Sequence, residues 1–123
     1  MTTAILEPIR NLSHLDALVA GSSVRPLLLF KHSQSCGTSH VANEELQEHL
    51  AQSPREVDYA IVTVQEQRNL SDSIAQRFSL RHETPQALLI RNGQLVWVAS
   101  HFRVTASAIS RAIDEATTAA GTA

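Results

Sequence analysis

The Asn92-Gly93 pair, set between two short apolar runs, constrains the fold of this chain more than any other feature. Asn-Gly readily adopts the two positive φ angles of a type I′ turn, which joins neighbouring antiparallel strands. The runs on either side, Ala87–Ile90 and Leu95–Ala99, have the length of strands. We therefore predict a β-hairpin in the last third of the chain.

Two earlier apolar runs predict strands of another kind. Leu27–Lys31 and Val57–Val64 are rich in consecutive apolar residues rather than alternating, which is typical of strands buried on both faces of a parallel sheet. Parallel strands need long crossover connections, usually helices. Apolar residues between the two runs recur at a spacing of four, and this pattern predicts such a helix.

Four helices are predicted from similar apolar spacing. They are expected over about 13–20, capped by Ser13 and closed by Gly21; over about 38–51, ended by Pro54; from Asn69 or Ser71 to Phe78; and from a cap at Thr105 to Ala116. The resulting order, α-β-α-β-α-β-β-α, is that of a thioredoxin-like fold. We predict one α/β domain over residues 1–123, a three-layer α/β/α arrangement with a four-stranded mixed sheet and an added N-terminal helix.

Composition and charge exclude several classes of partner. The chain has 123 residues, 43% hydrophobic and 18% charged, as expected for a globular domain. A net charge of −2 argues against nucleic acid and against a polybasic membrane contact. No apolar run approaches the ~20 residues that cross a bilayer, and Met1–Arg10 lacks the pattern of a secretory signal. One cysteine allows no internal disulfide, so a reducing, cytoplasmic location is expected.

Cys36, the single cysteine, is the strongest candidate for a functional residue. It follows the strand predicted at Leu27–Lys31 after a short polar loop and directly precedes a predicted helix. A thiolate at a helix N-terminus faces unpaired N–H groups and the positive end of the helix dipole, so it forms more easily than in a free thiol. A lone cysteine is more often a small buried hydrophobe, but residues 31–40 contain no other apolar side chain. We predict a partly exposed nucleophile.

Two neighbouring residues have open interpretations. Ser39 stands three residues after Cys36, where dithiol oxidoreductases carry a second cysteine. Two interpretations of its hydroxyl are open and compatible with each other: donation of a hydrogen bond to the Cys36 thiolate and an ordinary place in a first helical turn. Lys31, the only lysine, either attracts a substrate carboxylate and favours the thiolate through its charge, or is a solvated residue at the end of a strand.

The histidines carry weaker signals. His32 and His40 flank Cys36 and are open to the same interpretation as Lys31. His82, three residues before Pro85, is a less favoured candidate for a catalytic role, and His101 is expected to pack rather than to take part in catalysis. One cysteine and scattered histidines lack the spacing of zinc ligands, so no metal is expected.

Thr84-Pro85 immediately precedes the third predicted strand. An X-Pro bond is cis in only about 5–6% of folded cases, so the dipeptide alone would not predict a cis bond. The predicted fold does, because thioredoxin-like proteins have a cis-proline at this place, facing the cysteine. We expect Pro85 to contact Cys36 and the Thr84 backbone to bind an extended thiol substrate as an added strand.

Four segments carry a family resemblance: Phe30-Lys31-His32-Ser33; Cys36 with Ser39; Glu83-Thr84-Pro85-Gln86; and Ser100-His101-Phe102-Arg103-Val104-Thr105. Over about residues 10–115 the chain resembles the bacillithiol-system monothiol bacilliredoxins, a YtxJ-like family. The resemblance implies an oxidoreductase that removes a low-molecular-weight thiol, bacillithiol, from S-thiolated client proteins. It also implies Cys36 as nucleophile, Ser39 at the resolving position, Pro85 as cis-proline, and a small thiol as cosubstrate without a resident cofactor. Gly37 and Thr38 depart from the Cys-Pro-Ile-Ser common in the family.

Two other functions remain open. Cys36-Gly37-Thr38-Ser39 is also similar to the Cys-Gly-Phe-Ser site of monothiol glutaredoxins, which implies an iron–sulfur cluster held by two chains and two small thiols. Alternatively, Cys36 is only a site of thiolation in a non-catalytic stress protein that acts through partners. We rank the oxidoreductase first.

Overall fold

The computed structural model describes residues 5–52 and 54–122. Within these ranges the strands are β1 (Leu6–Pro8), β2 (Leu27–His32), β3 (Asp58–Thr63), β4 (Gln86–Arg91) and β5 (Gln94–Ser100). The helices are α1 (Leu12–Gly21), α2 (Gly37–Gln52), α3 (Arg68–Arg77), a 3₁₀ turn η1 (His101–Arg103) and α4 (Ala106–Thr122). Every helix and strand predicted from the sequence is present, so the predicted order of elements is confirmed.

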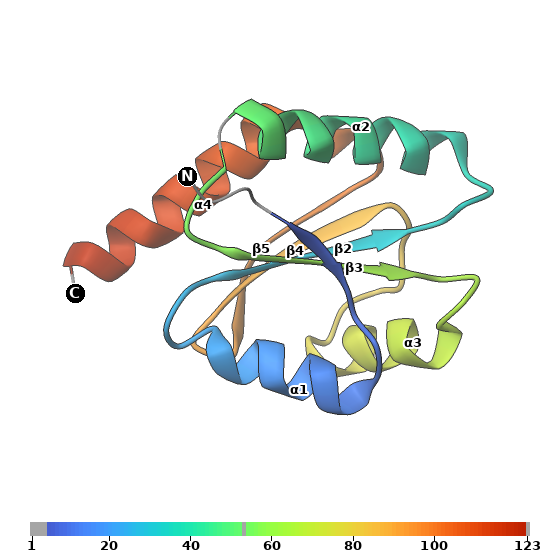
Figure 1. The fold of residues 1–123 in the computed structure, drawn as a ribbon, viewed down its shortest axis with the longest axis horizontal. Helices are drawn as coiled ribbons and strands as arrows, with labels where there is room; N and C mark the ends of the chain where they lie inside the picture. Colours follow the sequence, from blue (N-terminus) through green and yellow to red (C-terminus); the bar gives the residue numbers. More distant parts are fainter. Residues whose placement is uncertain (1–4, 53, 123) are drawn as a thin grey trace.

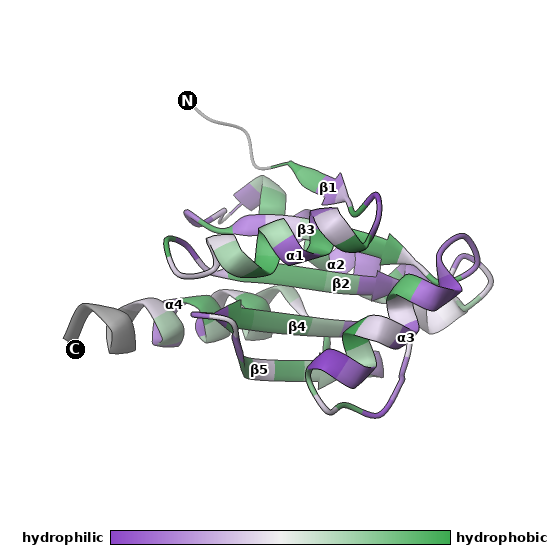
Figure 2. Ribbon diagram, turned by 90° about the horizontal axis from the view of Figure 1, so that it is seen from below, coloured by the Kyte–Doolittle hydropathy of each residue, from purple (hydrophilic) through white to green (hydrophobic). Residues whose placement is uncertain are grey.

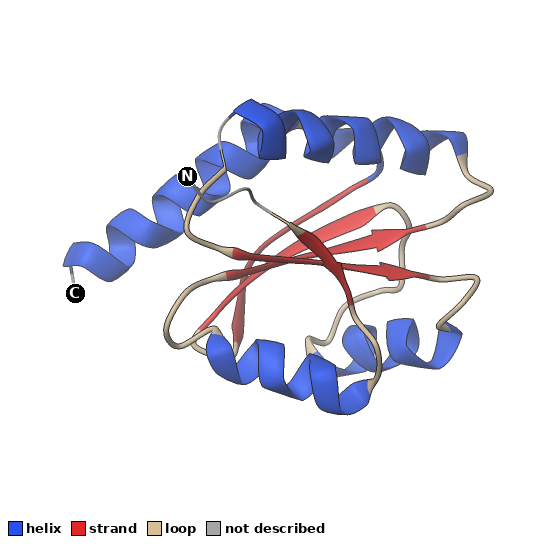
Figure 3. Cartoon of the chain, viewed as in Figure 1, coloured by secondary structure: helices blue, strands red, loops and turns tan. Residues whose placement is uncertain are grey.

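The described strands form one mixed sheet in the order β1-β3-β2-β4-β5 (Figures 1 and 3). β1, β3 and β2 are parallel, β4 is antiparallel to β2, and β5 is antiparallel to β4. The prediction of four strands missed β1, which pairs with β3 at the edge of the sheet through Leu6 and Tyr59. β1 has only three residues and is mostly exposed, so it lacks the apolar pattern by which a strand is recognised.

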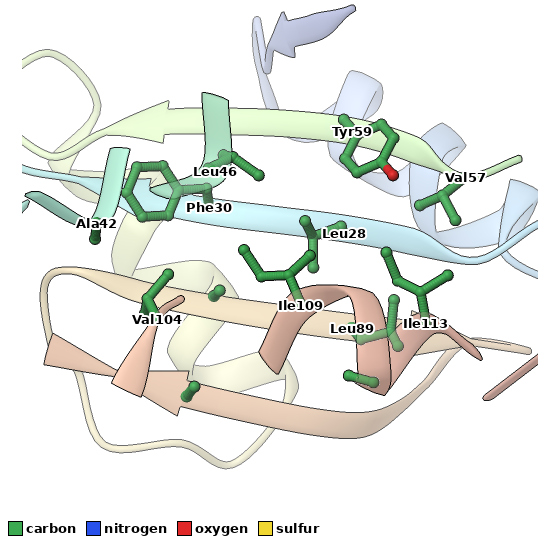
Figure 4. Packing of buried hydrophobic residues seen from close by; sticks show 13 residues of the cluster. Leu28, Phe30, Ala42, Leu46, Val57, Tyr59, Leu89, Val104, Ile109 and Ile113 are labelled. Atoms are coloured by element: carbon green, nitrogen blue, oxygen red, sulfur yellow. The ribbon is translucent and has the colours of Figure 1, made fainter. Parts of the chain in front are cut away.

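Helices cover both faces of the sheet, and each face has its own apolar cluster. Figure 1 shows α2 and α4 on one face and α1 and α3 on the other. Side chains alternate along β2 between the two clusters: Leu28 and Phe30 pack under α2 and α4 (Figure 4), whereas Leu27 and Leu29 pack under α1 and α3. Figure 2 shows hydrophobic residues concentrated on the central strands. The three-layer α/β/α architecture is therefore confirmed.

The hairpin between β4 and β5 is built as predicted. Asn92 and Gly93 both have positive φ angles, 54° and 74°, as a type I′ turn requires. Ser22, which follows α1, anchors the turn: its carbonyl accepts the Asn92 N–H at 2.9 Å and its Oγ accepts the Gly93 N–H at 2.8 Å. The end of α1 is thereby fixed to the far end of the sheet.

Helix starts were predicted less accurately than helix bodies. Asn11, not Ser13, caps α1, because its side chain accepts the His14 N–H at 2.8 Å. α1 runs through Gly21 and ends at Ser22 with ordinary right-handed backbone angles, so Gly21 provides no left-handed cap. The Thr105 cap of α4 is confirmed by the hydrogen bond from the Ala108 N–H to Thr105 Oγ1 at 3.1 Å.

Candidate active site

Cys36 lies at the start of α2, where the chain leaves the buried strand β2. Its carbonyl accepts the His40 N–H at 3.2 Å, the first bond of the helix, so Cys36 is the residue that caps α2. The residue is partly exposed and its thiol is free. A side chain at this position lies beside the N–H groups of the first helical turn, which have no partner within the helix. The predicted exposure of Cys36 and its place at a helix start are confirmed.

Ser39 holds the inner side of the loop that leads to Cys36. Its side chain is completely buried. Ser39 Oγ accepts the Ser33 N–H at 2.9 Å and is hydrogen-bonded to His32 Nδ1 at 2.8 Å. The hydroxyl is thus engaged with the loop and with β2, and donation to the Cys36 thiolate stays a prediction. These contacts also give Ser39 more than an ordinary first-turn role.

We expect Ser39→Ala to lower the free energy of unfolding by about 1–3 kcal/mol, because it leaves the buried Ser33 N–H and His32 Nδ1 without this partner. Loosening the same loop should also slow reactions of Cys36 without abolishing them. Urea unfolding and the rate of alkylation of Cys36 measure the two effects. Ser107→Ala, at an exposed serine of α4, is the matched control, and equal stability of the two variants would contradict this account.

His32 lies in surroundings that disfavour its positively charged form. It is nearly buried, stacks on Phe30 with ring centroids 5.8 Å apart, and meets His40 edge-on at 5.4 Å. Burial, followed by the neighbouring His40, lowers the pKa of His32. This lowered pKa argues against the prediction that His32 favours the thiolate by its charge. His40 is exposed and its Nε2 hydrogen-bonds to the Gln34 carbonyl at 2.8 Å.

Lys31 is completely buried and points to the face of the sheet that α1 and α3 cover, opposite to the side chain of His32. Its ammonium group hydrogen-bonds to His82 Nδ1 at 2.9 Å, and Ser71 Oγ lies 3.5 Å from the same nitrogen. Desolvation lowers the pKa of Lys31 to about 8, and desolvation followed by the Lys31 charge lowers the pKa of His82. The interpretation of Lys31 as a solvated residue at the end of a strand is therefore wrong. Its burial also argues against direct contact between Lys31 and a substrate carboxylate.

Thr84 and Pro85 lie at the same end of the sheet as Cys36. β4 begins directly after Pro85 and is antiparallel to β2, with Gln86 opposite Lys31, so the start of β4 lies beside the end of β2. The Thr84-Pro85 peptide bond is cis, as predicted. Pro85 is buried and Thr84 half-buried, and the Pro85 carbonyl accepts the His101 N–H at 2.9 Å. Contact of Pro85 with Cys36 stays a prediction.

Glu83 and His101 tie the start of β4 to the end of β5. The Glu83 carboxylate accepts a hydrogen bond from Ser100 Oγ at 2.7 Å and lies 3.5 Å from His101 Nε2. The Ser100 hydroxyl, followed by the charge of His101, lowers the pKa of Glu83. His101 has a positive φ angle of 56° and half of its side chain is exposed. His101 thus lies in the turn η1 after β5, next to Pro85.

Gln65 was not predicted from the sequence as part of the site. It lies just after β3 and contacts the loop before Cys36. Its side-chain amide hydrogen-bonds to Ser33, Gln34 and Ser35. A signal for it existed, because Gln65 comes just after β3, and the carboxyl ends of parallel neighbours such as β3 and β2 meet at one edge of the sheet. A polar residue at that position lies beside whatever follows β2.

Two other features were searched for over the described part of the chain. Among residues 5–52 and 54–122, no group of three or more histidine, cysteine or acidic residues is placed to hold a metal ion. Within the same ranges, no helix has both the length and the apolar character needed to span a membrane.

A single thiol at the N-terminus of α2 and a cis-proline directly before β4, at the same end of the sheet, are the arrangement of thioredoxin-fold thiol oxidoreductases. A solved protein with a thioredoxin fold is 27% identical, with a TM-score of 0.79 over 88% of this chain and 93% of its own. Mitochondrial thioredoxin 3 from Saccharomyces cerevisiae (16% identity, TM-score 0.70, 89% and 94% covered) and thioredoxin from Trypanosoma brucei brucei (8%, 0.74, 95% and 95%) share the fold. The family model of the monothiol bacilliredoxin BrxC matches residues 7–109, and the chain belongs to this family.

Proposed function

We propose that this protein is a monothiol-disulfide oxidoreductase that removes bacillithiol from mixed disulfides on client proteins through Cys36. The observation that carries the proposal is the placement of the only sulfur nucleophile, partly exposed, as the capping residue of the 16-residue helix α2. The N–H groups and the dipole at this helix end stabilise a thiolate. Family membership supports the redox role, and the identity of the small thiol is our inference from it.

The proposed reaction has two exchange steps. The Cys36 thiolate attacks the bacillithiol sulfur of the mixed disulfide, and the client leaves as a thiolate that takes up a proton. Cys36 is then joined to bacillithiol by a new disulfide. A second bacillithiol, as its thiolate, attacks the bacillithiol sulfur of that disulfide, which releases bacillithiol disulfide and restores the Cys36 thiolate. Each step breaks one S–S bond and forms one, and the second bacillithiol is the reductant.

Other residues act on this reaction without forming bonds to sulfur. Ser39 occupies the place of a resolving cysteine, so no second sulfur competes with bacillithiol for the Cys36 disulfide. Ser39 also holds the loop through Ser33 and His32. The Thr84 backbone, at the end of the sheet shared with Cys36, is proposed to pair with the extended client. A reducing cytoplasm, which supplies the small thiol, is the location that this reaction needs.

The proposal is tested by choosing the small thiol on one client. A protein with a single surface cysteine is converted to its bacillithiol or its glutathione mixed disulfide, and its free thiol is followed with the matching reductant. We expect turnover of the bacillithiol form to exceed that of the glutathione form by roughly tenfold or more, a difference of about 1.4 kcal/mol in transition-state binding. Equal rates for the two forms would remove bacillithiol from the proposal, and no turnover of either would reject the oxidoreductase itself.

A further inference from the structure

The outer side of the loop between β2 and α2 is held by one side chain from another part of the chain. Gln65 Oε1 accepts the Gln34 N–H at 3.0 Å, and Gln65 Nε2 donates to Ser33 Oγ at 2.8 Å and to Ser35 Oγ at 3.1 Å. A side-chain amide has one carbonyl oxygen and two N–H donors. All three groups of Gln65 are thus used on the three residues that directly precede Cys36.

This loop has weak hydrogen bonding of its own. The turn into the helix is closed by the Cys36 N–H and the Ser33 carbonyl at 3.5 Å, which is long for a backbone hydrogen bond. The stronger contacts come from side chains: Ser39 on the Ser33 N–H, His40 on the Gln34 carbonyl, and Gln65 on the outside. Both peptide groups of Gln34 are therefore fixed by side chains, one from α2 and one from beyond β3.

Gln65 can hold residues 33–35 in place because its own backbone is fixed to the sheet. We call its three side-chain hydrogen bonds to this loop the clamp. The preceding Val64 N–H donates to the His32 carbonyl at 2.9 Å, which extends the pairing of β3 with β2 up to the loop. The turn that follows is closed by the Glu66 and Gln67 N–H groups, which donate to the Thr63 carbonyl at 3.1 and 3.0 Å. Gln65 itself is exposed, so its contribution to the core is small. Its hydrogen bonds are directed at the Cys36 loop.

We propose that Gln65 is a positioning residue for thiol–disulfide exchange, which holds residues 33–35 so that the Cys36 sulfur stays at the N-terminus of α2. The inference rests on the proposed function only for its last consequence, the rate of exchange. Exchange requires the attacking, central and leaving sulfurs to approach along one line, and small displacements of a reacting group reduce rates strongly. The clamp also keeps the sulfur beside the helix N–H groups that favour its charged form.

Gln65→Ala tests the clamp, and Gln67→Ala is the matched control. Gln67 is the same residue type two positions later, but its side-chain amide donates to the Arg10 carbonyl at 3.1 Å, away from the Cys36 loop. We expect Gln65→Ala to exchange the Gln34 amide hydrogen faster, to change the rate of Cys36 alkylation, and to remove bacillithiol on the order of tenfold more slowly. Gln67→Ala should match the wild type in all three.

A second variant separates holding the loop from the charge near the sulfur. In Gln65→Glu the carboxylate can still accept the Gln34 N–H, and the Ser33 and Ser35 hydroxyls can turn to donate to it. The Gln34 amide should therefore stay protected in this variant, although it adds a negative charge near the sulfur.

Two results would overturn the proposal: Gln65→Ala matching Gln67→Ala in amide exchange and alkylation, or Gln65→Glu exposing the Gln34 amide as fully as Gln65→Ala does. Neither readout uses bacillithiol. A wild-type protein that fails to remove bacillithiol would therefore reject the proposed function, while the exchange and alkylation data would still decide the clamp.

Discussion

Cys36→Ser should abolish the release of bacillithiol from a client protein and reduce turnover to the uncatalysed rate. The chain contains no other cysteine, and neither a serine hydroxyl nor Ser39 can form the mixed disulfide on which the reaction depends. The loss should be complete at every pH, unlike the partial losses expected from changes in the surrounding loop. Following the free client thiol, with the variant and the wild type at equal concentration, measures it.

Two further measurements make this result specific to the sulfur. Serine is close to cysteine in size and Cys36 is partly exposed, so the variant should keep its Tm within a few degrees, because surface substitutions are usually within about 0.5 kcal/mol. Mass spectrometry should find bacillithiol on Cys36 of the wild type after contact with the client and none on the variant. Turnover by the Cys36→Ser protein would show that another group carries the chemistry.

The fold was predictable because its strongest signals are local in the sequence. Asn92-Gly93 determines a turn by its own backbone preferences, and β2 is buried on both faces, so its first four residues, Leu27–Phe30, form an unbroken apolar run. β1 had neither signal: it is a strand only because β3 offers it an open edge. The cap of α1 was not fixed by sequence because Asn11 and Ser13 are both residue types that cap helices, and the structure uses Asn11.

The position of Cys36 was predictable, but the network around it was not. Lys31 and His32 are consecutive residues of a strand buried on both faces, and side chains alternate along a strand, so both could have been predicted to be buried. Lysine is almost never fully buried, and this tendency favoured the wrong interpretation. Gln65 could not be paired with a particular loop atom from sequence, since its partners lie on the neighbouring strand's loop and depend on the register of β3 with β2.

Acidification from about pH 7.5 to about pH 5.5 should markedly destabilise the protein, because three histidines are held as neutral bases. Desolvation is the first cause of the lowered pKa of His32, His49 and His82. His49 illustrates the state: it is buried, with Nδ1 hydrogen-bonded to Ser110 Oγ and Nε2 to the Tyr59 hydroxyl, both at 2.8 Å. A protonated ring has no acceptor nitrogen, so each of these partners would have to accept from it.

The sign of the effect follows from proton binding. An unfolded histidine binds a proton as the pH falls through about 6.5, whereas the folded protein binds it only at lower pH. The unfolded chain therefore holds more protons in this range, and stability falls as the pH falls. Each pKa unit by which one histidine is lowered contributes about 1.4 kcal/mol. The pKa values of Glu83 and Asp114 are also lowered. These two carboxylates affect stability only at more acidic pH, below their ordinary pKa values of 4.5 and 3.8.

Urea unfolding at several pH values measures the effect, and two variants assign it. His49→Gln retains an amide that can bond to Ser110 and Tyr59 but cannot titrate, so its stability should decline less steeply between about pH 7.5 and about pH 5.5 than that of the wild type. His82→Gln removes a second histidine whose pKa is lowered by burial and by the Lys31 charge, and it should likewise reduce the slope. A wild type equally stable at both pH values would show that these buried rings accept protons without cost.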